Sequence, residues 1–196
     1  LGDVGEFTSC SAWKWKDKKC PPLEYQLPFI EEDIRAVNEG LDMFDNALDK
    51  VNCTNKFMLE GNHDDWTNRF VEKYPYMAHI AFKNSCRIKE RGYKFYSFNH
   101  PLKIGKLNFI HGAYATTYHA KKHSLTKLDS GTIGAWSMGC LKDMSPGKNR
   151  WLKGRLHNWN HAFGIITWMS NGNFQVEVIE IQKGVCFVWG NEINGN

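Results

Sequence analysis

Three short apolar runs in this sequence end at glycine and polar residues that could do chemistry. They are FMLEGNHD at 57–64, LGD at 1–3 and FIHG at 109–112. A short apolar run that ends at a glycine is typical of a buried strand, and the glycine permits a sharp exit from it. Open α/β sheets place their sites at the carboxyl ends of such strands. Aspartate, asparagine and histidine form a mixed oxygen and nitrogen ligand set, which suits Mn, Fe, Ni, Zn or Mg.

The order of these motifs resembles that of the calcineurin-like metallophosphoesterases. GDVGE at 2–6, GNHD at 61–64 and HG at 111–112 match the ordered motifs of that family. FTSCSAW at 7–13 and WSMGCL at 136–141 are similar to its phage and prophage branch. The resemblance covers most of the chain, although the second half matches by pattern more than by motif. It implies an α/β fold, a layered sandwich of two mixed β-sheets flanked by helices.

The resemblance also implies roles for five residues. Asp3 would bridge two divalent metal ions (Mn, Fe, Ni or Zn), and Asn62 and His111 would bind the second ion. His63 would lie beside the leaving oxygen and protonate it as a general acid. Asp64 would orient His63 or its loop. The implied activity is a metal-dependent phosphoesterase that hydrolyses phosphodiester bonds with a metal-activated hydroxide, with nucleic acid as one candidate substrate.

The chain departs from the family pattern in two places. It starts at Leu1, at what reads as the end of a second strand, so the first strand with its Asp-x-His motif is missing. It also lacks Gly-His-x-His, whose slot falls near His123 and Ser124. We expect both segments to belong to a longer protein, because a ligand-bearing strand end with no preceding strand makes little folding sense. If they are truly absent, a complete two-metal site cannot form.

Two alternative functions therefore stay open beside the phosphodiesterase. A phosphomonoesterase, including a protein phosphatase, would share every motif. A catalytically degenerate family member would instead bind a partner or phosphate. The formal net charge of +4 is compatible with a polyanionic substrate and tilts slightly toward nucleic acid. The basic clusters at 14–19 and 87–91 are more typical of solvated faces, although Trp13 and Trp15 among the lysines favour nucleic-acid contact a little.

Length and composition predict a single domain over 1–196 with a real core. The chain has 8 Trp, 12 Phe and 7 Tyr, which argues against a disordered chain. The 6 cysteines show no C-x-x-C spacing, so we expect no structural zinc site and a reducing, cytoplasmic compartment. No apolar stretch approaches the roughly 18 residues of a membrane span, so we expect no membrane partner. Oligomeric state, metal identity and natural substrate are left open.

Periodicity predicts helices that alternate with strands, followed by a strand-rich tail. The expected helices are 28–50, with Pro28 in its first turn and Ile30, Ile34, Val37, Leu41, Phe44 and Leu48 on one face, 64–74, 76–91 and 116–123. The expected strands are 56–59, 93–98, 107–110, 132–138, 164–168, 174–181 and 185–189. His119 and His123 share a helix face, where solvation or an outer-sphere role is favoured over ligation. A helix start at 64 would favour an anion such as a substrate phosphate.

Overall fold

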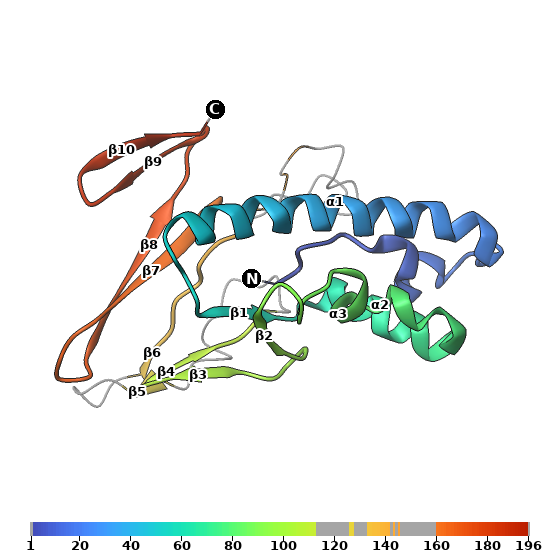
Figure 1. The fold of residues 1–196 in the computed structure, drawn as a ribbon, viewed down its shortest axis with the longest axis horizontal. Coiled ribbons are helices and arrows are strands. Elements are labelled where there is room, and N and C mark those ends of the chain that lie inside the picture. Colours follow the sequence, from blue (N-terminus) through green and yellow to red (C-terminus); the bar gives the residue numbers. More distant parts are fainter. Residues whose placement is uncertain are drawn as a thin grey trace. The chain divides into compact units, whose positions relative to one another are not determined.

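The computed structural model describes residues 2–112, 126–127, 133–141, 143, 145 and 160–195. These residues form a mixed α/β structure (Figure 1). The chain divides into two compact units, Leu1–Lys103 with Asn108–Ala113, and Ile104–Leu107 with Tyr114–Asn196. The described strands form five two-stranded sheets. The layered two-sheet sandwich and the single domain over 1–196 therefore stay predictions.

The first unit contains all the helices among the described residues. Its elements are η1 (Thr8–Cys10), η2 (Ala12–Trp15), α1 (Leu23–Lys50), β1 (Lys56–Leu59), α2 (Asn62–Lys73), η3 (Pro75–Ile80), α3 (Phe82–Ser85) and β2 (Tyr93–Tyr96). The strands β1 and β2 pair in parallel, with Met58 opposite Phe95. The hairpin of β3 (Leu102–Ile104) and β4 (Leu107–Phe109) follows, and its tip belongs to the second unit.

Helix α1 is longer than its apolar pattern predicts. It begins at Leu23, so Pro28 lies inside the helix and the prediction of Pro28 in the first turn is wrong. Pro22 precedes the helix, and the buried Gln26 side chain donates to the Pro21 carbonyl oxygen at 2.8 Å. The helix therefore begins directly after Pro21 and Pro22. The apolar face is buried as predicted at its centre, but Phe44 near the carboxyl end is 42% exposed.

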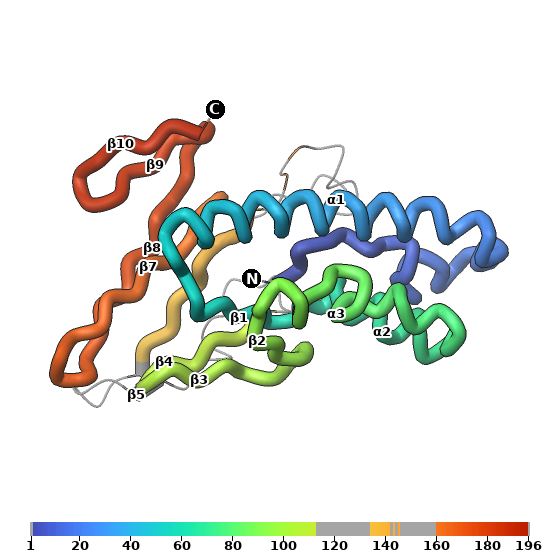
Figure 2. Tube along the Cα trace, viewed as in Figure 1, coloured from blue at the N-terminus to red at the C-terminus, as the bar shows by residue number. Residues whose placement is uncertain are grey.

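Two apolar clusters hold the first unit together. One lies between α1 and the β1–β2 pair, where Leu41, Met58 and Phe82 are buried with Phe7 of the amino-terminal loop (Figure 1). The other joins α1, α2 and η3 through residues such as Ile30. The chain that follows residue 2 runs alongside α1, in the violet and blue part of the tube (Figure 2). Contacts with both apolar clusters hold this amino-terminal segment in place. The segment carries Asp3.

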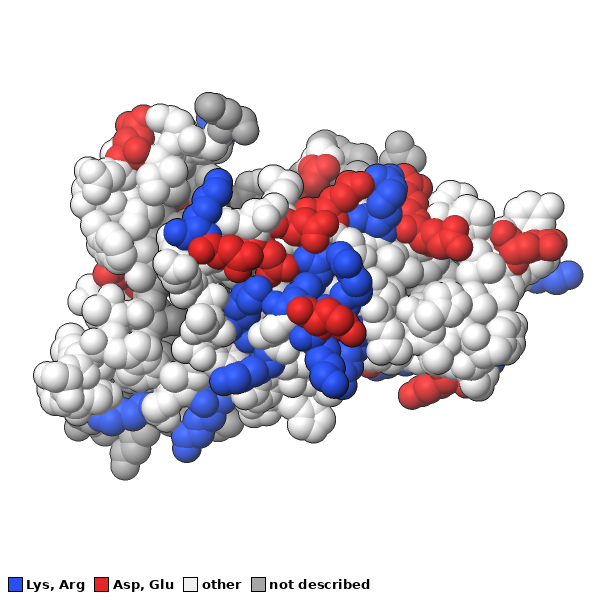
Figure 3. All heavy atoms as spheres, in the orientation of Figure 1, with Lys and Arg blue, Asp and Glu red and all other residues white. Residues whose placement is uncertain are grey.

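The predicted helix over 76–91 is wrong, because the chain there forms η3, the short α3 and a turn. Arg91 anchors this turn to α1. Its guanidinium is buried, with Nη1 2.6 Å from Asp45 Oδ2 and Nη2 2.6 Å from Asp42 Oδ1. Basic side chains gather over this turn and acidic ones over α1 on the face in Figure 3. The ion pairs tie the turn to α1.

The Asp45 ion pairs predict a loss of stability in acid. Burial alone would raise the pKa of Asp45, but hydrogen bonds from Lys56 and Arg91 outweigh it and lower that pKa. A lowered folded-state pKa stabilises the fold above about pH 4, and this contribution is lost as pH falls through the lowered value. We expect Asp45→Asn to cost about 1–2 kcal/mol at neutral pH, and the cost to shrink as pH falls through the lowered pKa of Asp45.

Urea denaturation at a series of pH values checks this expectation. The exposed Asp49 on the same helix supplies the matched control Asp49→Asn. A constant difference between wild type and Asp45→Asn across the acid range would contradict the assignment, because protonation of Asp45 should make the two proteins alike.

Among its described residues, the second unit contains three antiparallel strand pairs. They are β5 (Thr126–Lys127) with β6 (Ile133–Gly134), β7 (Ala162–Trp168) with β8 (Phe174–Glu180), and β9 (Val185–Val188) with β10 (Asn191–Asn194). The hairpin predicted between 164–168 and 174–181 is confirmed, and Gly172 adopts a φ of 80° in its turn. The predicted helix over 116–123, with His119 and His123, lies outside the described residues.

Among the described residues, no helix combines the length and hydropathy that a membrane span requires.

Candidate metal centre

Three side chains from separate parts of the first unit meet at the carboxyl ends of β1 and β4. Asp3 comes from the amino-terminal loop, Asn62 from the first residue of α2, and His111 from the segment after β4. His111 Nε2 lies 3.2 Å from Asp3 Oδ2 and 3.3 Å from Asn62 Oδ1. The structure thus brings together all three predicted metal ligands.

The spacing of these atoms fits a shared cation. Two donor atoms that each lie about 2.1 Å from one cation, at tetrahedral or octahedral angles, are roughly 3.0–3.4 Å apart. The same spacing permits hydrogen bonds from a protonated His111 Nε2, so a cation would replace that proton. Within the described ranges, no group of three or more His, Cys, Asp or Glu side chains could hold a metal. The set depends on the amide oxygen of Asn62.

Glycines make room for this convergence. Gly61 has φ −82° and ψ 170°, an extended conformation open to any residue, so the expected sharp exit is not its role. A Cβ at Gly61 would instead collide with the backbone nitrogen and Oδ1 of Asp3. A Cβ at Gly2 would lie 2.6 Å from His111 Nδ1 and 2.8 Å from the Leu59 carbonyl oxygen. Only glycine fits at Gly2 and Gly61, because the neighbouring loops approach too closely for a side chain.

Asp64 is the buried brace of the site. Its Oδ2 accepts hydrogen bonds from the backbone N–H groups of Gly61 at 2.9 Å and Asp3 at 3.0 Å. Its Oδ1 accepts from the Gly5 N–H at 3.4 Å. Burial raises the pKa of Asp64 to about 7; the Gly61 N–H opposes this shift and the charge of Asp3 adds to it. Asp64 therefore joins the amino-terminal loop to the start of α2, and these bonds orient the loops.

His63 lies beside the three predicted ligands. Its backbone N–H donates to Asp3 Oδ1 at 2.8 Å. Its ring stacks on Trp66 with centroids 4.0 Å apart and planes at 19°. Its Nδ1 lies 3.9 Å from Glu6 Oε2. The start of α2, expected to favour a substrate phosphate, therefore already holds the carboxylate of Asp3.

Electrostatics favour the ionised form of Asp3. Burial would raise its pKa, but the hydrogen bond and charge of His111, together with the charge and backbone N–H of His63, lower it overall. A carboxylate that stays ionised is the form that binds a cation.

The sequence pattern indicated no role for three residues that lie at this site or next to it in the chain. Glu6 was not predicted to bind metal, but its carboxylate lies near the His63 ring. Trp66 was not predicted to have any role, but its ring stacks on that of His63. Glu60 is buried, and its carboxylate accepts from Asn68 Nδ2 at 2.7 Å and the Phe98 N–H at 3.0 Å. An acid at the end of an apolar run was a visible signal for Glu60. The i, i+3 spacing of His63 and Trp66 was another.

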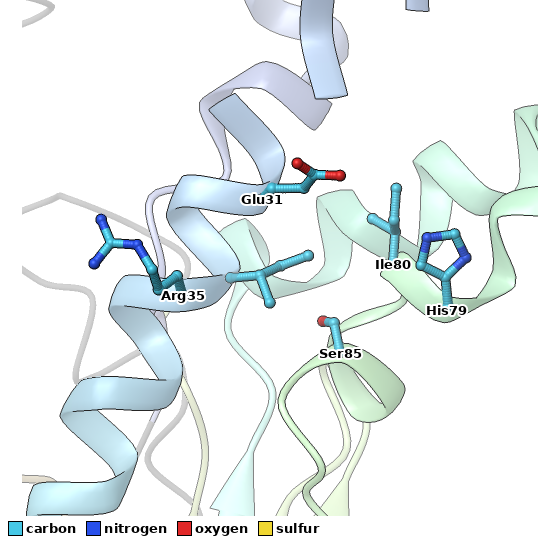
Figure 4. Close-up of a pocket in the computed structure, with 6 residues that line it drawn as sticks. Glu31, Arg35, His79, Ile80 and Ser85 are labelled. Atoms are coloured by element: carbon cyan, nitrogen blue, oxygen red, sulfur yellow. The ribbon is translucent and has the colours of Figure 1, made fainter. Parts of the chain in front are cut away.

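A separate hollow lies between α1 and the η3–α3 segment (Figure 4). It has a volume of about 350 Å³ and is lined by Glu31, Ile34, Arg35, His79, Ile80 and Ser85. None of the predicted site residues lines it. Arg35 pairs with Glu39 on α1 at 2.7 Å, which occupies its charge. The hollow is therefore separate from the candidate metal centre around Asp3.

No family model matches this chain, and no curated protein or solved structure matches it. The site itself is a mixed carboxylate, amide and imidazole set with an adjacent histidine.

Proposed function

We propose that this chain is a metal-dependent phosphoesterase of the calcineurin-like type that hydrolyses phosphodiester bonds. The observation that carries the proposal is the meeting of Asp3, Asn62 and His111, with His63 beside them. Motif order and the strand-end position of these residues support it further. The layered sandwich of two sheets and the likeness to the phage branch belong to the same proposal.

The donor set suits a divalent ion such as Mn, Fe, Ni or Zn. Asp3, Asn62 and His111 would hold one ion, and the free lone pairs of the Asp3 carboxylate leave it able to bridge to a second. A bound pair of such ions acidifies a water and neutralises charge on the phosphoryl oxygens.

The chain's own residues supply positioning and a proton. Asp64 holds Asp3 and the start of α2 in place through backbone hydrogen bonds. Trp66 fixes the plane of the His63 ring by stacking. Glu6, 3.9 Å from His63 Nδ1, attracts the imidazolium form. His63 would give its proton to the leaving oxygen as the phosphorus–oxygen bond breaks.

Metal-dependent turnover tests the proposal. The purified full-length protein, with the two segments that we expect beyond this sequence, should hydrolyse bis-p-nitrophenyl phosphate with Mn²⁺ or Ni²⁺ and lose this activity in EDTA. Asn62→Ala should raise the Kd for Mn²⁺ about tenfold or more. Losing a residue that only hydrogen-bonds to a metal ligand already costs about tenfold, so losing a direct ligand should cost at least as much. Isothermal titration measures this Kd.

The exposed Asn46 of α1 supplies the control Asn46→Ala, which should bind Mn²⁺ as wild type does. Absence of both Mn²⁺ binding and metal-dependent turnover would defeat the proposal. A substrate panel then separates diesters from the monoesters that a phosphomonoesterase would prefer.

A further inference from the structure

Aromatic and lysine side chains alternate on one surface of the first unit, formed by η2 and the first turns of α1. Trp13 is 71% exposed, Tyr25 65% and Phe29 60%. Lys14 and Lys16 lie on the same segment as Trp13. Large aromatic rings gathered on a surface are typical of an interaction site. We call Trp13, Lys14, Trp15, Lys16, Tyr25 and Phe29 the aromatic–lysine surface.

Contacts show that this surface is continuous. Lys14 Nζ lies 4.9 Å from the centroid of the Trp15 ring and 5.9 Å from that of Phe29, so it links η2 to α1. Lys16 Nζ lies 5.1 Å from the Trp13 ring centroid. Tyr25 is one helical turn before Phe29 on α1, a spacing that places the two on the same face.

The rings are presented from a fixed base. Trp15 Nε1 donates to the Ser9 carbonyl oxygen at 3.3 Å, and the Trp13 backbone N–H donates to Ser11 Oγ at 3.2 Å. Ser9 and Ser11 are buried. The segment that carries them continues from the loop of Asp3, so the surface and the candidate metal centre share one anchored stretch of chain.

We propose that the aromatic–lysine surface binds single-stranded nucleic acid. Exposed rings offer faces on which unpaired bases stack, and lysines between them neutralise the phosphates. Residues 13–19 contain four lysines and one aspartate, so the local charge favours a polyanion. A lysine that now covers a ring can swing to a phosphate on its flexible stem when a base takes its place.

The arrangement favours a nucleic acid over a membrane surface. Membrane-binding amphipathic segments separate an apolar face from a charged face. Here the ammonium groups lie over the rings themselves. The inference rests on the proposed function in one respect, since it names single-stranded polynucleotide as the substrate class of the same phosphoesterase.

Fluorescence anisotropy with a labelled oligo(dT) about 16 nucleotides long, enough for one site of this kind, tests the inference. EDTA in the buffer prevents hydrolysis. The double variant Trp13→Ala/Phe29→Ala should weaken binding about thirtyfold or more, which is at least about fivefold for each ring removed, with little change in salt dependence. Lys14→Gln/Lys16→Gln should instead lower the slope of log K against log salt by about 0.7 for each lost phosphate contact.

Trp189→Ala is the matched control, because Trp189 is 72% exposed and lies in the β9–β10 hairpin. Trp13→Phe should restore most of the affinity lost in Trp13→Ala, and urea midpoints should show that all variants stay folded. Equal affinity of wild type and Trp13→Ala/Phe29→Ala would overturn the inference. The inference would also be overturned if the protein does not bind the oligonucleotide but binds phosphatidylserine vesicles, or self-associates, in a way that the same substitutions weaken.

The two proposals can fail separately. Absent oligonucleotide binding with intact hydrolysis of bis-p-nitrophenyl phosphate overturns only the binding surface. Intact binding with no metal-dependent hydrolysis overturns only the phosphoesterase.

Discussion

Gly61→Ala should lower the free energy of unfolding by about 3 kcal/mol or more, the upper range for forced overpacking. The added Cβ would occupy the space of the Asp3 backbone nitrogen and Oδ1. Backbone at this point cannot give way cheaply, because Asp64 bonds to the N–H groups of both Gly61 and Asp3. The substitution should therefore push the Asp3 loop away from α2. It should abolish Mn²⁺ binding and also lower the stability of the fold.

Urea denaturation and Mn²⁺ titration measure the two effects. Gly40→Ala is the control, because a Cβ at Gly40 in α1 meets nothing within 4 Å. The control should gain about 0.5–1 kcal/mol from the higher helix propensity of alanine. If Gly61→Ala is as stable as wild type and still binds Mn²⁺, the close approach of Asp3 to Gly61 is wrong.

Features set by adjacent residues could be predicted from the sequence. The strand predicted at 56–59 coincides with β1, because an apolar run flanked by polar residues and glycine leaves little choice of register. The β7–β8 hairpin follows equally from its Ser-Asn-Gly-Asn turn. The five site residues were found by motif order, and His111 lies far from Asp3 in sequence. Their meeting depends on the fold rather than on any local pattern.

Features set by distant contacts could not be predicted. The chain over 76–91 has a helix-like pattern, but Arg91 is bound by Asp42 and Asp45 of α1, which favours a turn. Gly61 looked like a turn residue, yet its extended backbone shows that it is needed for space. Both results depend on residues from elsewhere in the chain, where periodicity carries no information.

His63→Ala should reduce kcat for a dinucleoside phosphodiester by about 10²–10⁴-fold, the usual contribution of a general acid. An alkoxide is a poor leaving group and needs the proton that His63 would supply. p-Nitrophenolate leaves without one, so the same variant should lose much less activity on bis-p-nitrophenyl phosphate. Steady-state kinetics with Mn²⁺ on both substrates gives the two losses.

The difference between those losses separates proton transfer from support of the metal ligands. The His63 N–H to Asp3 bond belongs to the backbone and survives in alanine, so the metal ligands should stay in place. His79→Ala, at an exposed histidine of η3, is the control and should match wild type on both esters. Equal loss on the two substrates would mean that His63 serves binding or metal geometry. The general-acid role would then pass to another group, with Glu6, 3.9 Å from His63 Nδ1, the first to examine.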